Sequence, residues 1–169
     1  MLKKPIFISQ KKFFDKRGFF QEVYLKKNLK ISSIFTAIAY SKKNVIRGLH
    51  FQINNKQTKI IHVVNGSILD VAVNLKKNSK NFGKVYYFNL IEGETLVVPN
   101  YFAHGYECLS KSCTILYHLD NYRNSKKESG ILYNDKSLKI KWISKKPIIS
   151  LRDKNSASFD DFKKNVKTL

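Results

Sequence analysis

The sequence predicts an all-β protein, an antiparallel sandwich or barrel, and three observations carry that prediction. Short apolar or alternating runs recur along the chain, turn residues separate them, and helical patterns are scarce. The runs are rich in valine, isoleucine, tyrosine and phenylalanine, and they span residues 45–52, 59–64, 67–75, 84–90, 95–98 and 114–119. Many short strands joined by regular turns are typical of antiparallel sandwiches and barrels.

The residues between these runs have the chemistry of turns. Asn65 and Gly66 accept positive φ angles and predict a hairpin between two of the strands. Residues 78–83 form a polar loop, residues 92–94 form a second turn, and Pro99 ends a strand. The boundaries of the predicted strands therefore follow from local chemistry.

Helical signals occur at two places only, a possible turn at 24–30 and a C-terminal segment that begins at Ser158. Ser158 and Asp161 have the spacing of a capping box. One apolar face of this helix would carry Phe159, Phe162 and Val166.

Length and composition indicate one folded domain over residues 1–169. The chain is 43% hydrophobic, which excludes intrinsic disorder as the default, and it has no internal repeat or low-complexity linker. No run approaches the length of a membrane span, and residues 1–10 lack the apolar core of a signal peptide. Cys108 and Cys113 are too few for a disulfide framework and are expected to be reduced, partly buried thiols. We expect a soluble cytoplasmic protein.

A formal net charge of +20 raises nucleic acid or an anionic membrane as partners. The lysines, however, are dispersed in short pairs, and base readout favours arginine. Most of the charge is therefore interpreted as solvated surface, and an attraction to anionic small molecules stays open. A basic RNA-binding β-barrel is the alternative from a different class. The four arginines are Arg17, Arg47, Arg123 and Arg152.

Arg47, Gly48 and His50 place a cation, a flexible residue and an imidazole within four positions of a predicted strand. In a regular strand Arg47 and His50 would face opposite sides. Their convergence needs a bulge or twist, which Gly48 permits. The local spacing favours a functional and a structural histidine equally.

A second cluster, Gly93-x5-Pro99-x4-His104-Gly105, matches the later half of the signature of cupin barrels. It predicts a cupin-type antiparallel β-barrel (jelly roll) with short peripheral helices. The metal-binding half is missing, because the chain has no His-x-His and its histidines lack compact ligand spacing. We therefore expect no metal site. The four histidines are His50, His62, His104 and His118.

Seven segments taken together resemble the dTDP-4-dehydrorhamnose 3,5-epimerase family, a metal-free branch of the cupins. In chain order they are FDKRGFFQE (14–22), NVIRGLHFQ (44–52), KIIHVVNGSILDVAV (59–73), SKNFG (79–83), VPNYFAHGY (98–106), ESGILYND (128–135) and IKW (140–142). The resemblance covers residues 5–155. It implies cofactor-free epimerisation at C3 and C5 of a nucleoside-diphospho-4-keto-6-deoxy sugar, with no nucleic acid or membrane partner.

The resemblance also implies roles for individual residues. Each epimerisation removes a proton beside the ketone and returns one to the opposite face, which requires a base, an oxyanion stabiliser and an acid. His50 would be the base, oriented by Asp153. Lys59 would place an ammonium near the enolate oxygen, and Asp70 would hold Lys59. Tyr117 would be the acid on the opposite face.

The same resemblance assigns substrate contacts. Arg17 and Arg47 would bind the diphosphate through charge-assisted hydrogen bonds. Phe20 and Glu22 would contact substrate, reaching the site of a neighbouring subunit, and the strand-like residues 6–9 could pair across such a homodimer. His62 and His118 are interpreted as structural. The full set of implied substrate-binding positions is Arg17, Phe20, Glu22, Arg47, Gln52, Asp70, His104, Tyr122 and Arg123.

Two departures from the family pattern bear on specificity. Phe35, Ala37 and Ala39 stand where the family often carries Gln-x-Asn-x-Ser, and Arg123 stands where a second aromatic residue is common. If these positions face the ligand, the sugar or nucleotide differs from the common one. The alternatives are therefore a C3-only epimerase on a different nucleotide sugar, a catalytically silent sugar-nucleotide sensor, and the RNA-binding barrel.

Overall fold

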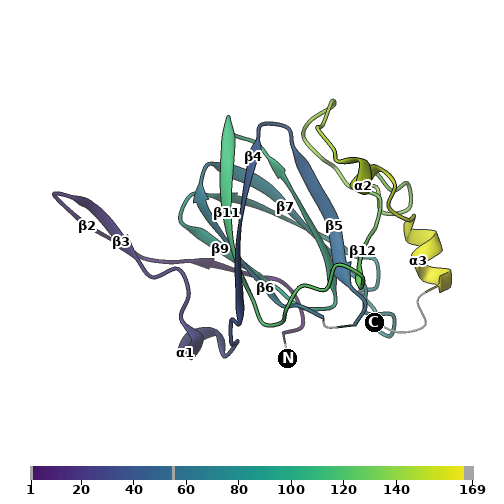
Figure 1. Ribbon diagram of the computed structural model, residues 1–169, viewed down its shortest axis with the longest axis horizontal. Coiled ribbons are helices and arrows are strands. Elements are labelled where there is room, and N and C mark those ends of the chain that lie inside the picture. The colour runs from purple at the N-terminus through teal and green to yellow at the C-terminus, as the bar shows by residue number, and fades with distance from the viewer. Residues whose placement is uncertain (1, 55, 166–169) are drawn as a thin grey trace.

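Two five-stranded antiparallel sheets face each other in the computed structural model, which describes residues 2–54 and 56–165 (Figure 1). The first sheet has the order β1 (Ile6–Ser9), β9 (Glu94–Val98), β6 (Lys59–Asn65), β11 (Ser112–Leu119), β4 (Phe35–Lys42). The second has the order β12 (Glu128–Gly130), β5 (Ile46–Gln52), β10 (Phe102–Cys108), β7 (Ser67–Asn74), β8 (Val85–Ile91). The predicted cupin-type barrel is confirmed.

The core has two parts because strand β7 is buried on both faces. Ile68 and Ala72 face the interior between the sheets, where they join residues of β6, β9 and β11. Val71 and Val73 alternate with them and face outward onto the C-terminal segments. This second cluster covers the outer face of the second sheet, while the first cluster packs between the two sheets.

Helix α3 (Phe159–Asn165) covers part of that outer face, and its sequence explains where it begins. Ser158 Oγ accepts a hydrogen bond from the Asp161 amide at 3.0 Å, which is the predicted cap. Phe159 and Phe162 are buried against the second cluster, as expected from the helical spacing. The third predicted member of this face, Val166, lies outside the described residues.

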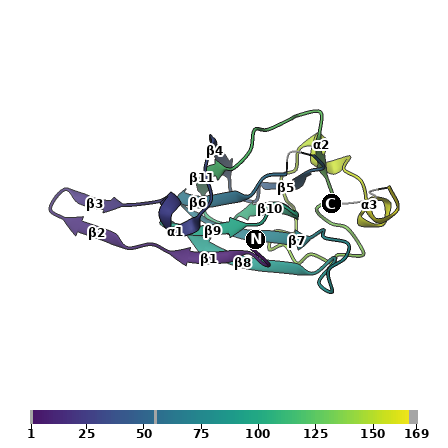
Figure 2. The ribbon, with the colours of Figure 1, turned by 90° about the horizontal axis from the view of Figure 1, so that it is seen from below.

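Strands β2 (Lys12–Asp15) and β3 (Gly18–Gln21) form a hairpin that projects away from the two sheets (Figures 1 and 2). Its base is fixed to the barrel: the Gln21 side-chain amide donates to Gly93 O at 2.9 Å. Beyond this base the hairpin exposes four large apolar side chains, Phe13, Phe14, Phe19 and Phe20. An exposed apolar cluster of this kind is typical of an interaction surface.

Two short helices complete the chain, α1 (Lys26–Leu29) and α2 (Leu151–Lys154). The strand that the sequence predicts at 6–9 is β1, and it pairs with β9 of its own chain. Among the described residues, no helix is long and apolar enough to cross a membrane.

Candidate active site

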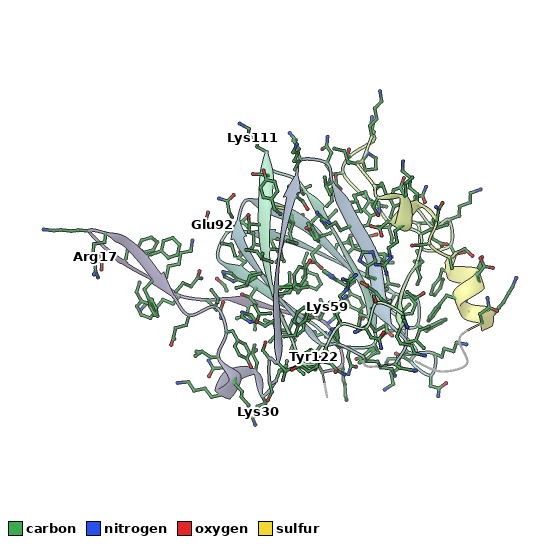
Figure 3. All side chains as sticks on the ribbon, in the orientation of Figure 1. Arg17, Lys30, Lys59, Glu92, Lys111 and Tyr122 are labelled. Carbon is green, nitrogen blue, oxygen red and sulfur yellow. The ribbon has the colours of Figure 1, made fainter. Side chains whose placement is uncertain are left out.

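A cavity of about 820 Å³ lies between the two sheets, and it is lined from β4, β5, β6, β10, β11 and the segment around α2. Its polar lining includes Arg47, His50, Lys59, Tyr117 and Asp153, which are distant in sequence. Figure 3 shows Lys59 between the sheets, far from Arg17 at the tip of the hairpin. The fold therefore brings the four predicted catalytic residues, and one of the two predicted diphosphate-binding arginines, to one cavity.

A bulge at Gly48 lets Arg47 and His50 both line this cavity. On β10 their partners Tyr106 and His104 are two positions apart, although Arg47 and His50 are three apart on β5. Gly48 has a φ of 133°, and a Cβ there would lie 2.5 Å from Gly105 Cα. The position therefore requires glycine for both its backbone angle and its close approach to β10.

His50 and Asp153 form a hydrogen-bonded pair at the cavity wall. His50 Nε2 lies 2.7 Å from Asp153 Oδ1, and Asp153 Oδ2 accepts the Gly48 amide at 3.2 Å. Asp153 lies on α2, whose first turn is capped by Ser150. Burial alone would raise the pKa of Asp153, but the hydrogen bond with His50 and the other donors hold that pKa below its usual value. With Nε2 bound to a carboxylate, Nδ1 of a neutral His50 carries the free lone pair.

Lys59 extends from β6 into the cavity, and its Nζ donates to the backbone oxygen of His50 at 3.1 Å. Burial lowers the pKa of Lys59 to about 8, against the opposing charges of Glu128 and Asp70. The ammonium is thus held beside the histidine in a partly desolvated place.

The prediction that Asp70 holds Lys59 is wrong. Asp70 Oδ2 lies 2.7 Å from His104 Nε2, both side chains are buried, and Asp70 does not line the cavity. The partner of the Asp70 carboxylate is therefore the imidazole of His104, which belongs to the neighbouring strand β10 and lines the cavity. Burial lowers the pKa of His104, and the charge of Asp70 opposes that effect.

Tyr117 approaches the cavity from the sheet opposite His50. It lies on β11, directly across from Ala37 on β4, and its ring meets the His104 ring edge-on with centroids 6.3 Å apart. Burial raises the pKa of Tyr117 well above that of a free phenol. The phenol is therefore protonated at neutral pH, as a proton donor must be.

Arg47 is oriented by the strand that faces it. Its Nε donates to Ser41 Oγ at 2.9 Å and its Nη2 donates to Tyr40 O at 2.9 Å. The Ser41 hydroxyl in turn pairs with the Tyr106 hydroxyl at 2.8 Å. Because only part of the guanidinium is engaged, N–H donors remain for an anion in the cavity.

Glu128 binds two arginines, Arg123 and Arg152, in the wall of the cavity, and the sequence predicted only part of this cluster. Its Oε2 accepts Arg123 Nη2 at 2.7 Å and Arg152 Nη1 at 3.2 Å, and all three residues line the cavity. Burial alone would raise the pKa of Glu128, but the two arginines lower it. Of these three residues, only Arg123 is among the predicted substrate-binding positions. The rarity of arginine in a lysine-rich chain is the signal that could also have found Arg152.

Besides Asp70, five predicted substrate-binding residues do not line this cavity in their own chain: Arg17, Phe20, Glu22, Gln52 and Tyr122. The first three belong to the projecting hairpin or follow it, and Arg17 pairs with Asp15 at 2.6 Å. Gln52 is buried, and its side-chain oxygen accepts the amide of Asn124. Tyr122 is exposed (Figure 3), and it directly precedes Arg123 in the sequence.

The two histidines interpreted as structural also lie off the cavity. His62 Nδ1 pairs with Thr95 Oγ1 at 2.8 Å within the first sheet. His118 Nδ1 lies 3.2 Å from Thr36 Oγ1, and its ring stacks on Tyr24. Within the described chain, no group of three or more His, Cys, Asp or Glu residues could hold a metal ion.

The positions that depart from the family pattern do face the cavity. Phe35, Ala37 and Ala39 alternate along β4 with outward residues, and all three line the cavity. Leu119 and Ile148 extend this apolar lining. One wall is therefore polar and carries the titratable groups, while the wall formed by β4 offers no side-chain hydrogen bond from these three positions.

The barrel brings an imidazole–carboxylate pair, an ammonium and a phenol together around one open cavity. This arrangement defines the class of the protein as an enzyme that catalyses proton transfer on a small molecule. Comparison with known proteins gives the family. The family described as dTDP-4-dehydrorhamnose 3,5-epimerase matches residues 1–161, and the chain belongs to that family.

Individual relatives agree with this assignment. The dTDP-4-dehydrorhamnose 3,5-epimerase of Shigella flexneri is 36% identical over 160 residues, which cover 89% of this chain and 88% of that protein. The crystal structure of the Bacillus anthracis enzyme with TDP and pyrophosphate bound is 38% identical, with a TM-score of 0.87 and coverage of 91% and 93%. The Legionella pneumophila enzyme in complex with dTDP-4-keto-L-rhamnose is 28% identical, with a TM-score of 0.90 and coverage of 94% and 89%.

Proposed function

We propose that this chain epimerises C3 and C5 of a nucleoside-diphospho-4-keto-6-deoxy sugar of the dTDP-4-dehydro-6-deoxyglucose type. The observation that carries the proposal is the convergence of His50, Lys59 and Tyr117 on one cavity. The reaction exchanges no electrons and transfers no group, so proton-transfer side chains and a stabiliser of negative charge suffice for it. The names of the relatives, and the nucleotide ligands of two of them, support the same substrate class.

His50 is assigned as the base. The C–H bonds at C3 and C5 are acidified by the C4 ketone, and Nδ1 of His50 would accept the proton. The resulting imidazolium is stabilised by Asp153, which accepts from Nε2 at 2.7 Å. Asp153 also fixes the ring orientation, so the lone pair on Nδ1 keeps its direction between the two epimerisations.

Lys59 is assigned as the stabiliser of the enolate oxygen. Its Nζ uses one donor on the backbone oxygen of His50, which leaves two donors for the substrate. A charge that develops on the C4 oxygen near this ammonium is stabilised strongly, because the site is partly shielded from water. The same desolvation depresses the pKa of Lys59, so the group is charged only below about pH 8.

Tyr117 is assigned as the acid that returns a proton to the opposite face of the sugar. It belongs to β11 of the first sheet, whereas His50 belongs to β5 of the second, so a sugar ring held between the sheets would have one group on each face. Proton removal on one side and delivery on the other inverts the carbon.

The diphosphate would be held by arginines of the cavity. Arg47 keeps free N–H donors on one side, and the pair Arg123 and Arg152 presents further donors beside Glu128. Guanidinium groups match the geometry of phosphate oxygens and stay charged at every working pH. The two phosphate groups of the substrate therefore explain why three of the four arginines line the cavity.

We further propose that the enzyme is a homodimer in which the hairpin of one subunit completes the cavity of the other. The hairpin holds Arg17 and Phe20 away from their own cavity, and it exposes four phenylalanines. A side chain that binds substrate from this position must therefore serve a partner's site. A second copy of the chain would also cover the apolar faces of the hairpin.

We also propose that the protein is cytoplasmic and that residues 1–169 form one domain. Two free cysteines, Cys108 and Cys113, support a reducing compartment. Fractionation of the host cell tests this placement, and recovery in an oxidising compartment would contradict it.

Solvent exchange tests the activity. The protein is incubated with dTDP-4-keto-6-deoxyglucose in heavy water, and NMR follows label at C3 and C5. Label at both carbons is expected, whereas label at C3 alone would indicate the mono-epimerase alternative. His50→Ala should abolish exchange while the protein remains folded, and undiminished exchange would refute the assigned base. If neither this substrate nor other 4-keto sugar nucleotides exchange, while RNA binds with a steep salt dependence, the basic barrel is the correct interpretation.

A further inference from the structure

Five exposed lysines belong to three segments that meet beside the cavity residues Val45 and Ile148, and we call them the lysine collar. They come from three segments: the end of β4, the turn between β10 and β11, and the coil that precedes α2. The collar consists of Lys42, Lys43, Lys111, Lys145 and Lys146.

Backbone hydrogen bonds hold the three segments together. The Lys43 amide donates to Lys111 O at 3.0 Å, which joins the end of β4 to the β10–β11 turn. The Ile148 amide donates to Asn44 O at 2.8 Å, which joins the coil before α2 to the same place. These bonds fix the three segments relative to one another, although Lys42 and Lys146 are 104 residues apart in sequence.

The collar borders the opening of the cavity. Val45 and Ile148 form a bridge between two of the segments, and both line the cavity. Ile148 is 57% exposed, so the cavity reaches solvent at this edge. Figure 3 places Lys111 at the end of β11 that is remote from Tyr122. Arg47, two positions after Val45 in the chain, also lines the cavity.

No nearby acid neutralises this charge. Residues 40–48, 109–112 and 143–150 contain no aspartate or glutamate. Within residues 2–54 and 56–165, none of the five lysines forms an ion pair. The carboxylate beneath the collar, Glu107, is 1% exposed and accepts the amides of Ile143 and Ser144 at 2.7 Å each. The solvent at this opening therefore meets mainly positive charge.

We propose that the lysine collar captures the anionic nucleoside diphosphate from solution and guides it to Arg47 and the cavity. This inference rests on the proposed function, because it requires an anionic substrate. Charges of one sign around the opening of a low-dielectric cavity raise the association rate of an oppositely charged ligand by about 10–10³-fold. This attraction acts over roughly one Debye length. The collar would thus change how fast the substrate arrives, with little effect on how it is held or converted.

The test compares two triple variants that lose the same charge. Lys43→Gln, Lys111→Gln and Lys146→Gln neutralise part of the collar. Lys80→Gln, Lys136→Gln and Lys141→Gln neutralise three exposed lysines that do not line the cavity and lie outside residues 40–48, 109–112 and 143–150. Stopped-flow fluorescence measures the association and dissociation rates of labelled dTDP at about 0.02 M and about 0.5 M salt.

The collar variant should associate about five- to tenfold more slowly than the control variant at low salt, and within about twofold of it at high salt. Dissociation rates and solvent exchange at saturating substrate should not change. Equal slowing of both variants would overturn the proposal in favour of net charge alone, and no slowing of either would overturn it outright. If the unaltered protein exchanges label normally while association is insensitive to the collar, only this inference fails. If it binds no dTDP and exchanges no label, the proposed function has failed first.

Discussion

Asp153 binds two atoms of strand β5 at once, His50 Nε2 at 2.7 Å and the Gly48 amide at 3.2 Å. The carboxylate therefore fixes both the imidazole and the bulge that turns the imidazole toward the cavity. Asp153 itself is positioned by α2, because its amide donates to the capping Ser150. A short helix near the C-terminus thus controls the direction of a side chain in the centre of the barrel.

Asp153→Asn should lower the rate of label exchange by about 10²- to 10⁴-fold. An amide in place of the carboxylate cannot stabilise imidazolium, and its NH₂ group favours the tautomer with the proton on Nδ1. Asp160→Asn, at an exposed carboxylate of α3, is the control and should leave the rate unchanged. Equal rates for Asp153→Asn and the unaltered protein would show that the pair does not act in proton transfer.

Tyr117→Phe should separate proton loss from inversion. Without the phenol, His50 still removes the proton and can return a deuteron to the face from which it came. Label should therefore enter the substrate at a near-normal rate, while the inverted product forms at least about tenfold more slowly. NMR of the sugar gives both rates in one sample. Equal inhibition of both would argue against an acid role for Tyr117.

Much of the fold could be predicted from local patterns. The runs at 59–64 and 67–75 became β6 and β7, and Asn65-Gly66 is the turn between them, with Gly66 at a φ of 86°. Strand β4 was missed because its exposed residues include Ile38 and Tyr40, which hide the alternation that marks a half-buried strand. Strand β10 was missed because all seven of its residues are buried. A strand that is buried on both faces lacks the alternation of apolar and polar residues by which a half-buried strand is predicted.

The site was harder to predict than the fold, because side-chain partners depend on which strands are neighbours. Asp70 lies on β7, and β7 pairs with β10, so His104 is its partner. Lys59 lies on β6 of the other sheet, and no local pattern reveals that separation. Conversely, the need for a bulge at Gly48 could be deduced from strand geometry alone. Arg47 and His50 are three positions apart, and in a regular strand side chains at that spacing point to opposite faces.

The Lys59 ammonium predicts an alkaline limit to activity. Its pKa is lowered to about 8, so the charged form is present below that pH and is lost as the pH rises through it. The exchange rate at saturating substrate should therefore fall above about pH 8. Lys59→Arg keeps a cation at all working pH values and should remove this fall, at a lower maximal rate. An unshifted alkaline limit in Lys59→Arg would assign the limit to another group.

The projecting hairpin predicts a dimer whose disruption costs activity. Phe14 is 74% exposed and Phe20 is 66% exposed in the isolated chain. Analytical ultracentrifugation should find the unaltered protein as a dimer, and Phe14→Asp with Phe20→Asp should shift it toward monomer. Exchange should fall with dimer content, because Arg17 would no longer reach a partner's cavity. Ile91→Asp, at an exposed apolar residue of β8, is the control. A fully active monomer would exclude any contribution of the hairpin to catalysis.

The apolar wall of β4 predicts altered recognition of sugar hydroxyls. Ala37 lies across from Tyr117 on β11, so its methyl group faces the region where the sugar ring is expected. A hydroxyl that meets this wall loses a hydrogen bond worth about 1 kcal/mol, which corresponds to roughly fivefold in affinity. Ala37→Asn with Ala39→Ser should therefore raise kcat/KM for dTDP-4-keto-6-deoxyglucose relative to an analogue that lacks the hydroxyl on C2. Thr36→Asn, on the outward face of the same strand, should leave this ratio unchanged. A ratio that stays constant in the double variant would mean that the β4 wall contacts another part of the substrate, because a restored hydrogen bond would act on only one of the two sugars.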